Sequence, residues 1–147
     1  MTGASMLPTF SDKQILSVNK GITDIKRGDI IIMNVSKSTN EMFIKRIIGL
    51  PGEIIKIIDG RVLMKHSRIS DFVEFEEEYL SEYNKGKTFL PLNVKETEFL
   101  IPEGKYFVMG DNRSNSSDSR SCFQSCSIEG SSHFLDQKDI VGKVIKF

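Results

Sequence analysis

The sequence predicts a mostly β fold, and three observations support that prediction. Helical periodicity is poor, short runs rich in Ile, Val and Phe recur along the chain, and Gly, Pro, Asn and Asp separate those runs. With 147 residues, the chain also has the length of one domain that can bury a hydrophobic core. We therefore expect a single domain, residues 1–147, built from short strands connected by turns.

The expected strands share this composition and are, in chain order, Gln14–Val18, Ile30–Val35, Met42–Ile48, Ile54–Ile58, Arg61–Lys65, Tyr106–Met109 and Ile140–Ile145. Asp59-Gly60 follows the fourth strand and predicts a two-residue hairpin of type I′, because both residue types tolerate a positive φ. The one expected helix is Asp71–Tyr83, in which three aromatic residues and Glu82 fall roughly on one face.

The net charge argues against a nucleic-acid partner, and the hydropathy argues against a membrane-spanning segment within the chain. Twenty basic residues balance twenty acidic ones, whereas nucleic-acid binding requires a basic face, so we expect no nucleic-acid partner. The acidic run Glu74–Glu78 is interpreted as a solvated face, the usual role of such runs. No apolar run approaches the roughly 18–20 residues that span a bilayer, so no transmembrane segment is expected within the chain.

The two cysteines, Cys122 and Cys126, leave two alternatives open. Two ligands cannot complete a structural zinc site, and His66 and His133 lie outside the usual spacing, so no metal or other cofactor is expected. An extracytoplasmic protein could close the pair into a small disulfide loop. Two free thiols in a mobile loop are equally compatible with the sequence, since geometry decides between them.

Ser5 and Lys45 each occur in an unusual short context. Ser5 lies in Gly3-Ala4-Ser5-Met6-Leu7-Pro8, and Lys45 lies in an apolar strand between Ile44 and Ile47. A serine can attack a peptide bond only if a base removes its proton. A lysine can be that base when burial keeps it neutral, because desolvation disfavours the ammonium form. A turn serine and a lysine at a strand edge are the ordinary alternatives, but together the two contexts predict a nucleophile and its base.

Two further segments accompany this pair: Lys26-Arg27-Gly28-Asp29-Ile30-Ile31-Ile32, and Gly110-Asp111-Asn112-Arg113-Ser114-Asn115-Ser116-Ser117-Asp118-Ser119-Arg120. With all four segments in this order, the chain resembles the catalytic domain of a bacterial type I signal peptidase of the Gram-positive type. The resemblance covers residues 3–52 and 104–147. It implies a β fold of coiled antiparallel sheets, shared with LexA-like domains, and a small variable subdomain inserted at about residues 59–100, with the core formed by residues 1–58 and 101–147.

The resemblance also implies an activity and a location. Such enzymes are membrane-associated serine endopeptidases that remove N-terminal signal peptides from secreted precursors, and they cut after small residues at −1 and −3. They act on the outer face of the cytoplasmic membrane and carry an N-terminal anchor shortly before the serine motif. Here that motif begins at residue 3, so we expect the chain to lack the anchor, with Met1 an added start residue.

By resemblance, Ser5 is the nucleophile, Lys45 is the general base, and the Ser116 hydroxyl orients the lysine amine. The Ser5 backbone N–H is one expected donor to the oxyanion. Gram-negative relatives add a hydroxyl two residues before the nucleophile. That position is Gly3 here, the Gram-positive pattern, so a backbone group or a water must supply the second donor.

The remaining expectations concern support and substrate. The resemblance pairs Arg46 with Asp111 and Asp118 with Arg120, behind the nucleophile and base. An extended substrate needs an exposed strand edge, for which Met42–Lys45 is the candidate. Candidate walls of the substrate pocket, for which ordinary core packing is an equal alternative, are Met6, Met42, Phe43 and Ile44. Exposed apolar residues expected to favour a membrane are Met1, Met6 and Leu7.

Two alternatives stay open at this point. A LexA-like domain also uses a Ser/Lys pair but cleaves its own Ala-Gly bond, and this chain contains no Ala-Gly. A non-catalytic homologue acting as a chaperone or scaffold in surface-protein assembly, for example of a pilus, need not keep both Ser5 and Lys45. The segment Ser121–Leu135 is longer than in relatives and carries both cysteines, so the resemblance does not predict its local structure.

Overall fold

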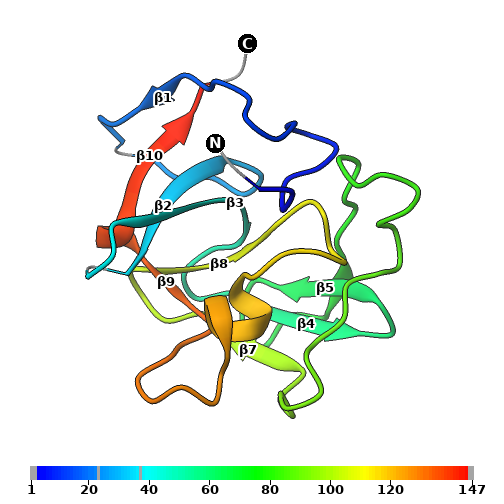
Figure 1. Ribbon diagram of the computed structural model, residues 1–147. Helices are drawn as coiled ribbons and strands as arrows, with labels where there is room; N and C mark the ends of the chain where they lie inside the picture. Colours follow the sequence, from blue (N-terminus) through cyan, green and yellow to red (C-terminus); the bar gives the residue numbers. More distant parts are fainter. Residues whose placement is uncertain (1–2, 23, 37, 146–147) are drawn as a thin grey trace.

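The computed structural model describes residues 3–22, 24–36 and 38–145 and folds them into two antiparallel sheets (Figure 1). The six-stranded sheet has the order β1 (Val18–Asn19), β10 (Ile140–Val144), β2 (Ile30–Ser36), β3 (Glu41–Gly49), β8 (Lys105–Met109) and β9 (Leu135–Asp136). The four-stranded sheet has the order β6 (Val73–Glu74), β5 (Arg61–Lys65), β4 (Ile54–Ile58) and β7 (Glu98–Leu100). Two short 3₁₀ helices, η1 (Ser119–Gln124) and η2 (Gln137–Asp139), complete the described elements. The predicted mostly β fold is confirmed.

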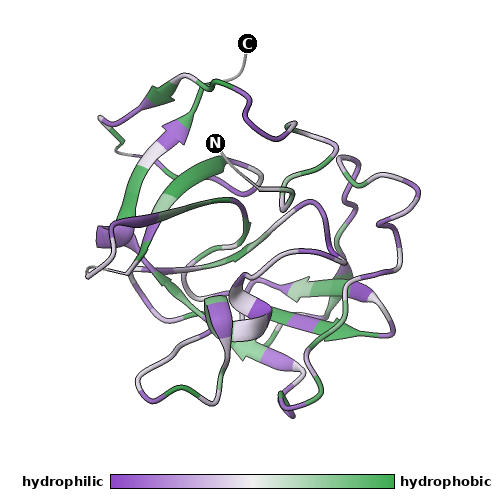
Figure 2. Cartoon of the chain, viewed as in Figure 1, coloured by the Kyte–Doolittle hydropathy of each residue, from purple (hydrophilic) through white to green (hydrophobic). Residues whose placement is uncertain are grey.

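The two sheets share one hydrophobic cluster. Ile48, Phe107 and Met109 enter it from the six-stranded sheet, and Ile55 and Phe99 enter it from the four-stranded sheet. Figure 2 shows hydrophobic residues concentrated along strands such as β2, β10 and β5, while the loops are largely hydrophilic. Because close-packed side chains resist displacement, this cluster gives β3 and β8 fixed positions. Those two strands carry or lead into the residues of the candidate site.

The strand predictions are largely confirmed. The expected strands at 30–35, 42–48, 54–58, 61–65, 106–109 and 140–145 correspond to β2, β3, β4, β5, β8 and β10, with ends shifted by at most one residue. The predicted strand Gln14–Val18 is wrong, since only Val18 of it is in a strand. Asp59 and Gly60 have φ values of 52° and 74°, as the predicted type I′ turn between β4 and β5 requires.

The predicted helix at Asp71–Tyr83 is wrong. The segment contains only β6 and turns. Its aromatic residues have separate partners rather than one common face: Phe72 lies under the ammonium groups of Lys56 and Lys65, and Tyr79 lies 3.8 Å from the Arg46 guanidinium. Spacing alone suggested a helix, but contacts with cations from other strands determine the local conformation.

The segment predicted as an excursion forms most of the four-stranded sheet. β4, which the sequence analysis grouped with residues 1–58, pairs with β5 on one side and β7 on the other. The division into a core and an inserted subdomain at about residues 59–100 stays a prediction. Among the described residues, no helix combines the length and the apolar character that crossing a bilayer requires.

Candidate active site

Ser5 and Lys45 meet although they lie 40 positions apart in the sequence. Lys45 Nζ is 2.9 Å from Ser5 Oγ and also 2.9 Å from the carbonyl oxygen of Ile44. Ser5 lies in the N-terminal turn, where Leu7 N–H donates to the Ala4 carbonyl oxygen. Lys45 projects from the buried half of β3. The contact is short enough for a proton to pass directly between the two side chains.

Burial changes the protonation of Lys45. The side chain is almost fully enclosed, and the residue is 3% exposed. Desolvation lowers the pKa of Lys45 to about 8, against smaller opposing effects of the Asp118 and Asp111 carboxylates. The Phe43 ring, 4.9 Å from Nζ, adds to the apolar surroundings. A substantial fraction of the amine is therefore neutral near pH 8 and able to accept a proton.

The edge of β3 beside Lys45 is open on one side. β2 pairs with β3 from Glu41 to Arg46, whereas β8 pairs only with Arg46, Ile47 and Gly49. Among the described strands, none pairs with Met42–Lys45 on the β8 side. Unpaired backbone groups at such an edge can hydrogen-bond an extended peptide.

A cleft of about 570 Å³ runs past the serine and lysine and is lined in part by Met42, Phe43 and Ile44. Met42 is 57% exposed. Met6, the fourth expected wall, is fully buried and packs with Phe10 and Ile44 in the core, so for Met6 the core-packing alternative holds. The expectation that Met6 presents apolar surface to a membrane is also wrong; Leu7 is half-buried, and Met1 lies outside the described residues.

The two expected ion pairs are present and buried. Arg46 Nε and Nη2 lie 2.8 Å and 2.6 Å from the two carboxylate oxygens of Asp111. Arg120 Nε and Nη2 each lie 2.9 Å from an oxygen of Asp118. Burial raises the pKa of Asp118, but the Arg120 guanidinium and the Gly110 N–H outweigh it, so the pKa lies below its usual range. The Asp118 carboxylate is therefore held as an anion within the protein interior.

Backbone contacts attach the Ser5 turn to the segment after β8. Asn112 N–H donates to the Ser5 carbonyl oxygen at 2.9 Å, and its side-chain amide donates to the Ala4 carbonyl oxygen at 3.0 Å. A Cβ on Gly110 would lie 2.4 Å from the Ser5 carbonyl oxygen, so only glycine permits this approach. The sequence analysis did not predict that Asn112 holds the Ser5 turn, although Asn112 lies within the Gly110–Arg120 segment that carries the family resemblance.

Arg113 has partners that the sequence did not predict. Its guanidinium makes a two-pronged ion pair with Glu77, and Nη1 lies 2.6 Å from Thr88 Oγ1. Its Nε also donates to the Gly110 carbonyl oxygen at 3.0 Å. The Glu77 side chain is only 7% exposed, so the interpretation of the whole acidic run as a solvated face is wrong at this residue. No local signal marks Glu77, because its partner lies 36 positions away.

Two expected supporting residues make fewer contacts than predicted. Ser116 Oγ is buried near Gly110 and helps to lower the pKa of Asp118, whereas Lys45 Nζ donates to Ser5 and to the Ile44 carbonyl oxygen. Gly3 has a φ of 113°, and its N–H donates to Asp12, so this N–H is engaged away from Ser5. Their expected roles stay predictions.

Comparison with known proteins assigns the chain to a family. The family described as "Signal peptidase, peptidase S26" matches residues 1–147. The chain belongs to this signal peptidase family. Its Ser5 and Lys45 motifs, and the segment from Gly110 to Arg120, therefore lie in a chain that matches the family over its whole length.

Individual relatives agree with this assignment. The chain is 39% identical to Signal peptidase I P of Bacillus subtilis subsp. natto over 145 residues, which cover 95% of this chain and 70% of that protein. It is 40% identical to Signal peptidase I U of Bacillus subtilis (strain 168), covering 80% of this chain but 62% of that protein. A crystal structure of a signal peptidase I from Enterococcus faecalis V583 superposes with a TM-score of 0.57 at 30% identity, covering 86% of this chain and all of that one. The chain thus spans about three fifths to seven tenths of the length of these curated relatives.

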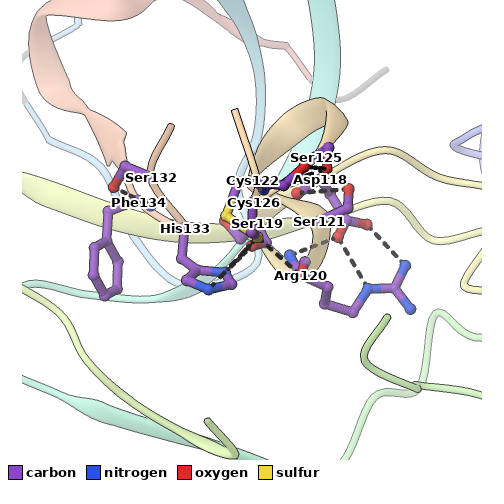
Figure 3. The surroundings of a disulfide bond; sticks show 11 residues. Asp118, Ser119, Arg120, Ser121, Cys122, Ser125, Cys126, Ser132, His133 and Phe134 are labelled. Carbon is purple, nitrogen blue, oxygen red and sulfur yellow. Dashed lines mark hydrogen bonds and ion pairs between the residues drawn. A yellow bond between two sulfur atoms is a disulfide. The ribbon is translucent and has the colours of Figure 1, made fainter. Parts of the chain in front are cut away.

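The segment Ser121–Leu135 contains a disulfide (Figure 3). Cys122 and Cys126 are bonded, with their Cα atoms 5.0 Å apart, which decides between the two alternatives that the sequence left open. Asp118 caps η1 by accepting from the Arg120 N–H, and Ser119 Oγ accepts from Val108 N–H at 2.8 Å. The disulfide therefore lies in the same short segment that carries one of the two buried ion pairs.

Proposed function

We propose that this protein is a serine endopeptidase that removes signal peptides from secreted precursors, with Ser5 as nucleophile and Lys45 as general base. The observation that carries the proposal is the 2.9 Å contact between Lys45 Nζ and Ser5 Oγ, made by a lysine whose pKa burial lowers to about 8. Membership of the signal peptidase family supports the same reaction.

In the proposed reaction, neutral Lys45 accepts the Ser5 hydroxyl proton as Ser5 Oγ bonds to the scissile carbonyl carbon. The carbonyl π electrons move to oxygen, where the Ser5 backbone N–H is the proposed donor. The C–N bond then breaks, and Lys45 returns its proton to the leaving amine. A water, deprotonated by Lys45, hydrolyses the resulting ester and releases Ser5. Gly110 and Asn112 hold the Ser5 turn in place through the cycle.

The open edge of β3 is the proposed binding site for the substrate. An extended signal peptide adds along Met42–Lys45, and its alternate side chains enter the cleft lined by Phe43 and Ile44. These bulky apolar walls favour small residues at −1 and −3. We place the reaction on the outer face of the cytoplasmic membrane, with an N-terminal anchor in the native protein, as the family resemblance implies.

A panel of precursor peptides differing only at −1 tests the proposal. The parent should cut alanine and glycine peptides and leave leucine and lysine peptides intact, and Ser5→Ala should cut none of them, because it lacks the nucleophile. Equal cutting of alanine and leucine peptides contradicts the small pocket. Cutting by Ser5→Ala at the parental rate contradicts the nucleophile. Cleavage confined to a bond within the chain itself favours the self-processing alternative.

A further inference from the structure

The buried Arg46–Asp111 pair connects the turn that carries the proposed nucleophile to the strand that carries the proposed base. Thr9, which follows Ser5 in the N-terminal turn, donates its hydroxyl hydrogen to the Asp111 carboxylate. The same carboxylate accepts two hydrogen bonds from Arg46, the residue after Lys45 in β3. This three-residue bridge therefore joins the turn to β3 behind the 2.9 Å contact between Ser5 Oγ and Lys45 Nζ.

Tyr79 covers the bridge from the segment 59–100. It lies in a turn after β6, and the centre of its ring is 3.8 Å from the Arg46 guanidinium carbon. The hydrogen bonds of that guanidinium go to Asp111 and to the Gly28 carbonyl oxygen, which is 2.9 Å from Nη1. The guanidinium is thus hydrogen-bonded along its edge and covered by an aromatic ring on one face, an arrangement that suits its planar, delocalised charge.

The fold also fixes the position of Tyr79. Its hydroxyl donates to the Glu77 carboxylate at 2.6 Å, and Arg113 Nη2 lies 3.4 Å from the same hydroxyl oxygen. Burial raises the pKa of Tyr79 above its ordinary value, so the hydroxyl keeps its hydrogen at neutral and moderately alkaline pH. The ring packs against the hydrophobic cluster between the two sheets. Its place over Arg46 is therefore determined by contacts at both ends of the side chain.

Removing the ring would change the surroundings of the bridge. The Arg46 and Asp111 side chains are 8% and 0% exposed, and opposite charges attract more strongly where water is excluded. Without the ring, water reaches the guanidinium and competes for its hydrogen bonds, and a weaker bridge lets the N-terminal turn shift relative to β3. A misplacement of about 1 Å between reacting groups can lower a rate by about 10²-fold. The ring can therefore affect turnover although Tyr79 is not among the described residues that line the cleft beside Ser5.

We propose that Tyr79 is a positioning residue of the peptidase, whose ring holds Arg46 on Asp111 and thereby keeps Ser5 Oγ against Lys45 Nζ. The inference rests on the proposed function. It adds to that function a residue from a segment that carries no family motif. The ring acts on Arg46 directly, whereas the hydroxyl only helps to orient the ring.

Two variants at position 79 separate the ring from the hydroxyl, with steady-state kinetics on the alanine precursor peptide as the measurement. Tyr79→Leu loses the ring and should lower kcat by about 10–10²-fold with KM within about twofold of the parent, because the reacting geometry changes and the cleft does not. Tyr79→Phe keeps the ring and should retain kcat within about threefold. Comparing the two variants therefore assigns the effect to the stacked ring.

The pH–rate profile gives a second readout, which a purely structural defect would not move. The charges that act on Lys45 are those of Asp118, Arg120 and Asp111, and the Asp111 carboxylate raises the pKa of Lys45. In Tyr79→Leu, Arg46 neutralises that carboxylate less completely, while Asp118 and Arg120 are unchanged. The midpoint of the profile should therefore lie at a higher pH than in the parent.

Phe75→Leu is the matched control. Phe75 belongs to the same segment, packs against the same hydrophobic cluster and lies 5.5 Å from another guanidinium, that of Arg27. Arg27 pairs with Glu53, which is outside the bridge. Phe75→Leu should therefore keep the parental kcat and pH midpoint. Rates are compared per folded molecule, with the folded fraction taken from urea unfolding, and Tyr79→Met replaces Tyr79→Leu if the leucine variant does not fold.

The possible outcomes separate this inference from the proposed function. A Tyr79→Leu protein whose kcat and pH midpoint match those of Phe75→Leu overturns the inference, and so does a Tyr79→Phe protein as slow as Tyr79→Leu. In both cases an active parent leaves the proposed function standing. A parent that cleaves no precursor peptide overturns the proposed function and this inference with it.

Discussion

The six-stranded sheet and the segment 59–100 differ in what their sequences reveal, yet both contribute to the candidate active site. Every recognisable motif lies in or beside the six-stranded sheet. The segment 59–100 has none, but it supplies Glu77, Tyr79 and Thr88 to the arginines of those motifs. Motifs therefore mark the residues that react, whereas the residues that hold them can lie in a segment without any motif.

Two buried ion pairs make this comparison concrete. Arg46 and Asp111 both belong to the six-stranded sheet and its following turn, and the sequence predicted their pairing. Arg113 and Glu77 join the two regions, and the sequence did not predict that they pair. All four side chains are at most 8% exposed. If burial determines how much an ion pair contributes to the free energy of unfolding, the Arg113–Glu77 pair contributes as much as the Arg46–Asp111 pair.

The largest expected effect is that of Lys45→Met. Cleavage should fall by at least about 10²–10⁴-fold, since the general base is lost. The free energy of unfolding should rise by as much as about 3 kcal/mol, because the depressed pKa of Lys45 means that its charged form is destabilised by burial. Steady-state kinetics on a signal peptide substrate and urea unfolding measure the two quantities.

The control for this variant is Lys56→Met in the four-stranded sheet, where the lysine side chain is 29% exposed. It should keep parental activity. A Lys45→Met protein that cleaves within about tenfold of the parent contradicts the assignment of the base, because general-base catalysis exceeds that factor.

Glu77→Ala should have the next largest effect. It leaves the buried Arg113 guanidinium without its carboxylate, and removing one partner of a buried pair lowers the free energy of unfolding by about 3–5 kcal/mol. Asp111→Ala should lose a similar amount. Thermal and urea unfolding of both variants beside Glu76→Ala, which changes an exposed neighbour, tests the equivalence of the two regions. A Glu77→Ala protein as stable as Glu76→Ala shows that the segment 59–100 does not support the site.

The features that could be predicted from the sequence are those that a local residue pattern or a family motif determines. Lys45 and Arg46 are successive residues of β3, so their side chains leave the strand on opposite faces, and they reach Ser5 and Asp111 respectively. The turn at Asp59-Gly60 followed from residue type alone. The turn depends only on residues close together in the sequence. The distant contacts could be predicted because both partners lie in recognisable motifs.

The features that the sequence did not predict depend on contacts between distant segments. Glu77 lies in an acidic run that resembles a solvated face, and only Arg113 explains its burial. Met6 is apolar and close to Ser5, so the sequence is compatible with a place in the cleft wall or in the core. Its packing against Phe10 and Ile44 shows that it is a core residue. His133 reaches Cys126 only because η1 and the loop after it fold back.

The pH dependence should be smaller, about tenfold. The pKa of Lys45 is about 8, so the neutral fraction of the amine rises from about one tenth at pH 7 to about nine tenths at pH 9, and cleavage should rise with it. Stability changes in the same direction. Between the folded pKa of about 8 and the unfolded value of 10.5, the unfolded chain binds more protons, so the free energy of unfolding rises with pH across that window.

A pH–rate profile and urea unfolding at several pH values test both statements. Below about pH 8 the destabilisation by Lys45 is complete and should not change further with pH. Lys45→Met should lose the rise in stability between pH 8 and 10.5. A rate that is flat from pH 6 to 9 argues against a lysine base, and an unchanged stability rise in Lys45→Met assigns that titration to another group.

The smallest expected effect is that of Glu74→Ala, three positions before Glu77 in the same acidic run. Glu74 lies 3.3 Å from Arg61 across β5 and β6, but the two side chains are 54% and 50% exposed. Exposed ion pairs contribute about 0–1 kcal/mol, because water screens the attraction and holding two long side chains costs entropy. Urea unfolding should therefore show a change several times smaller than for Glu77→Ala, with parental cleavage. If Glu74→Ala destabilises as much as Glu77→Ala, the acidic run acts through its total charge, and the specific contact of Glu77 with Arg113 is not what joins the two regions.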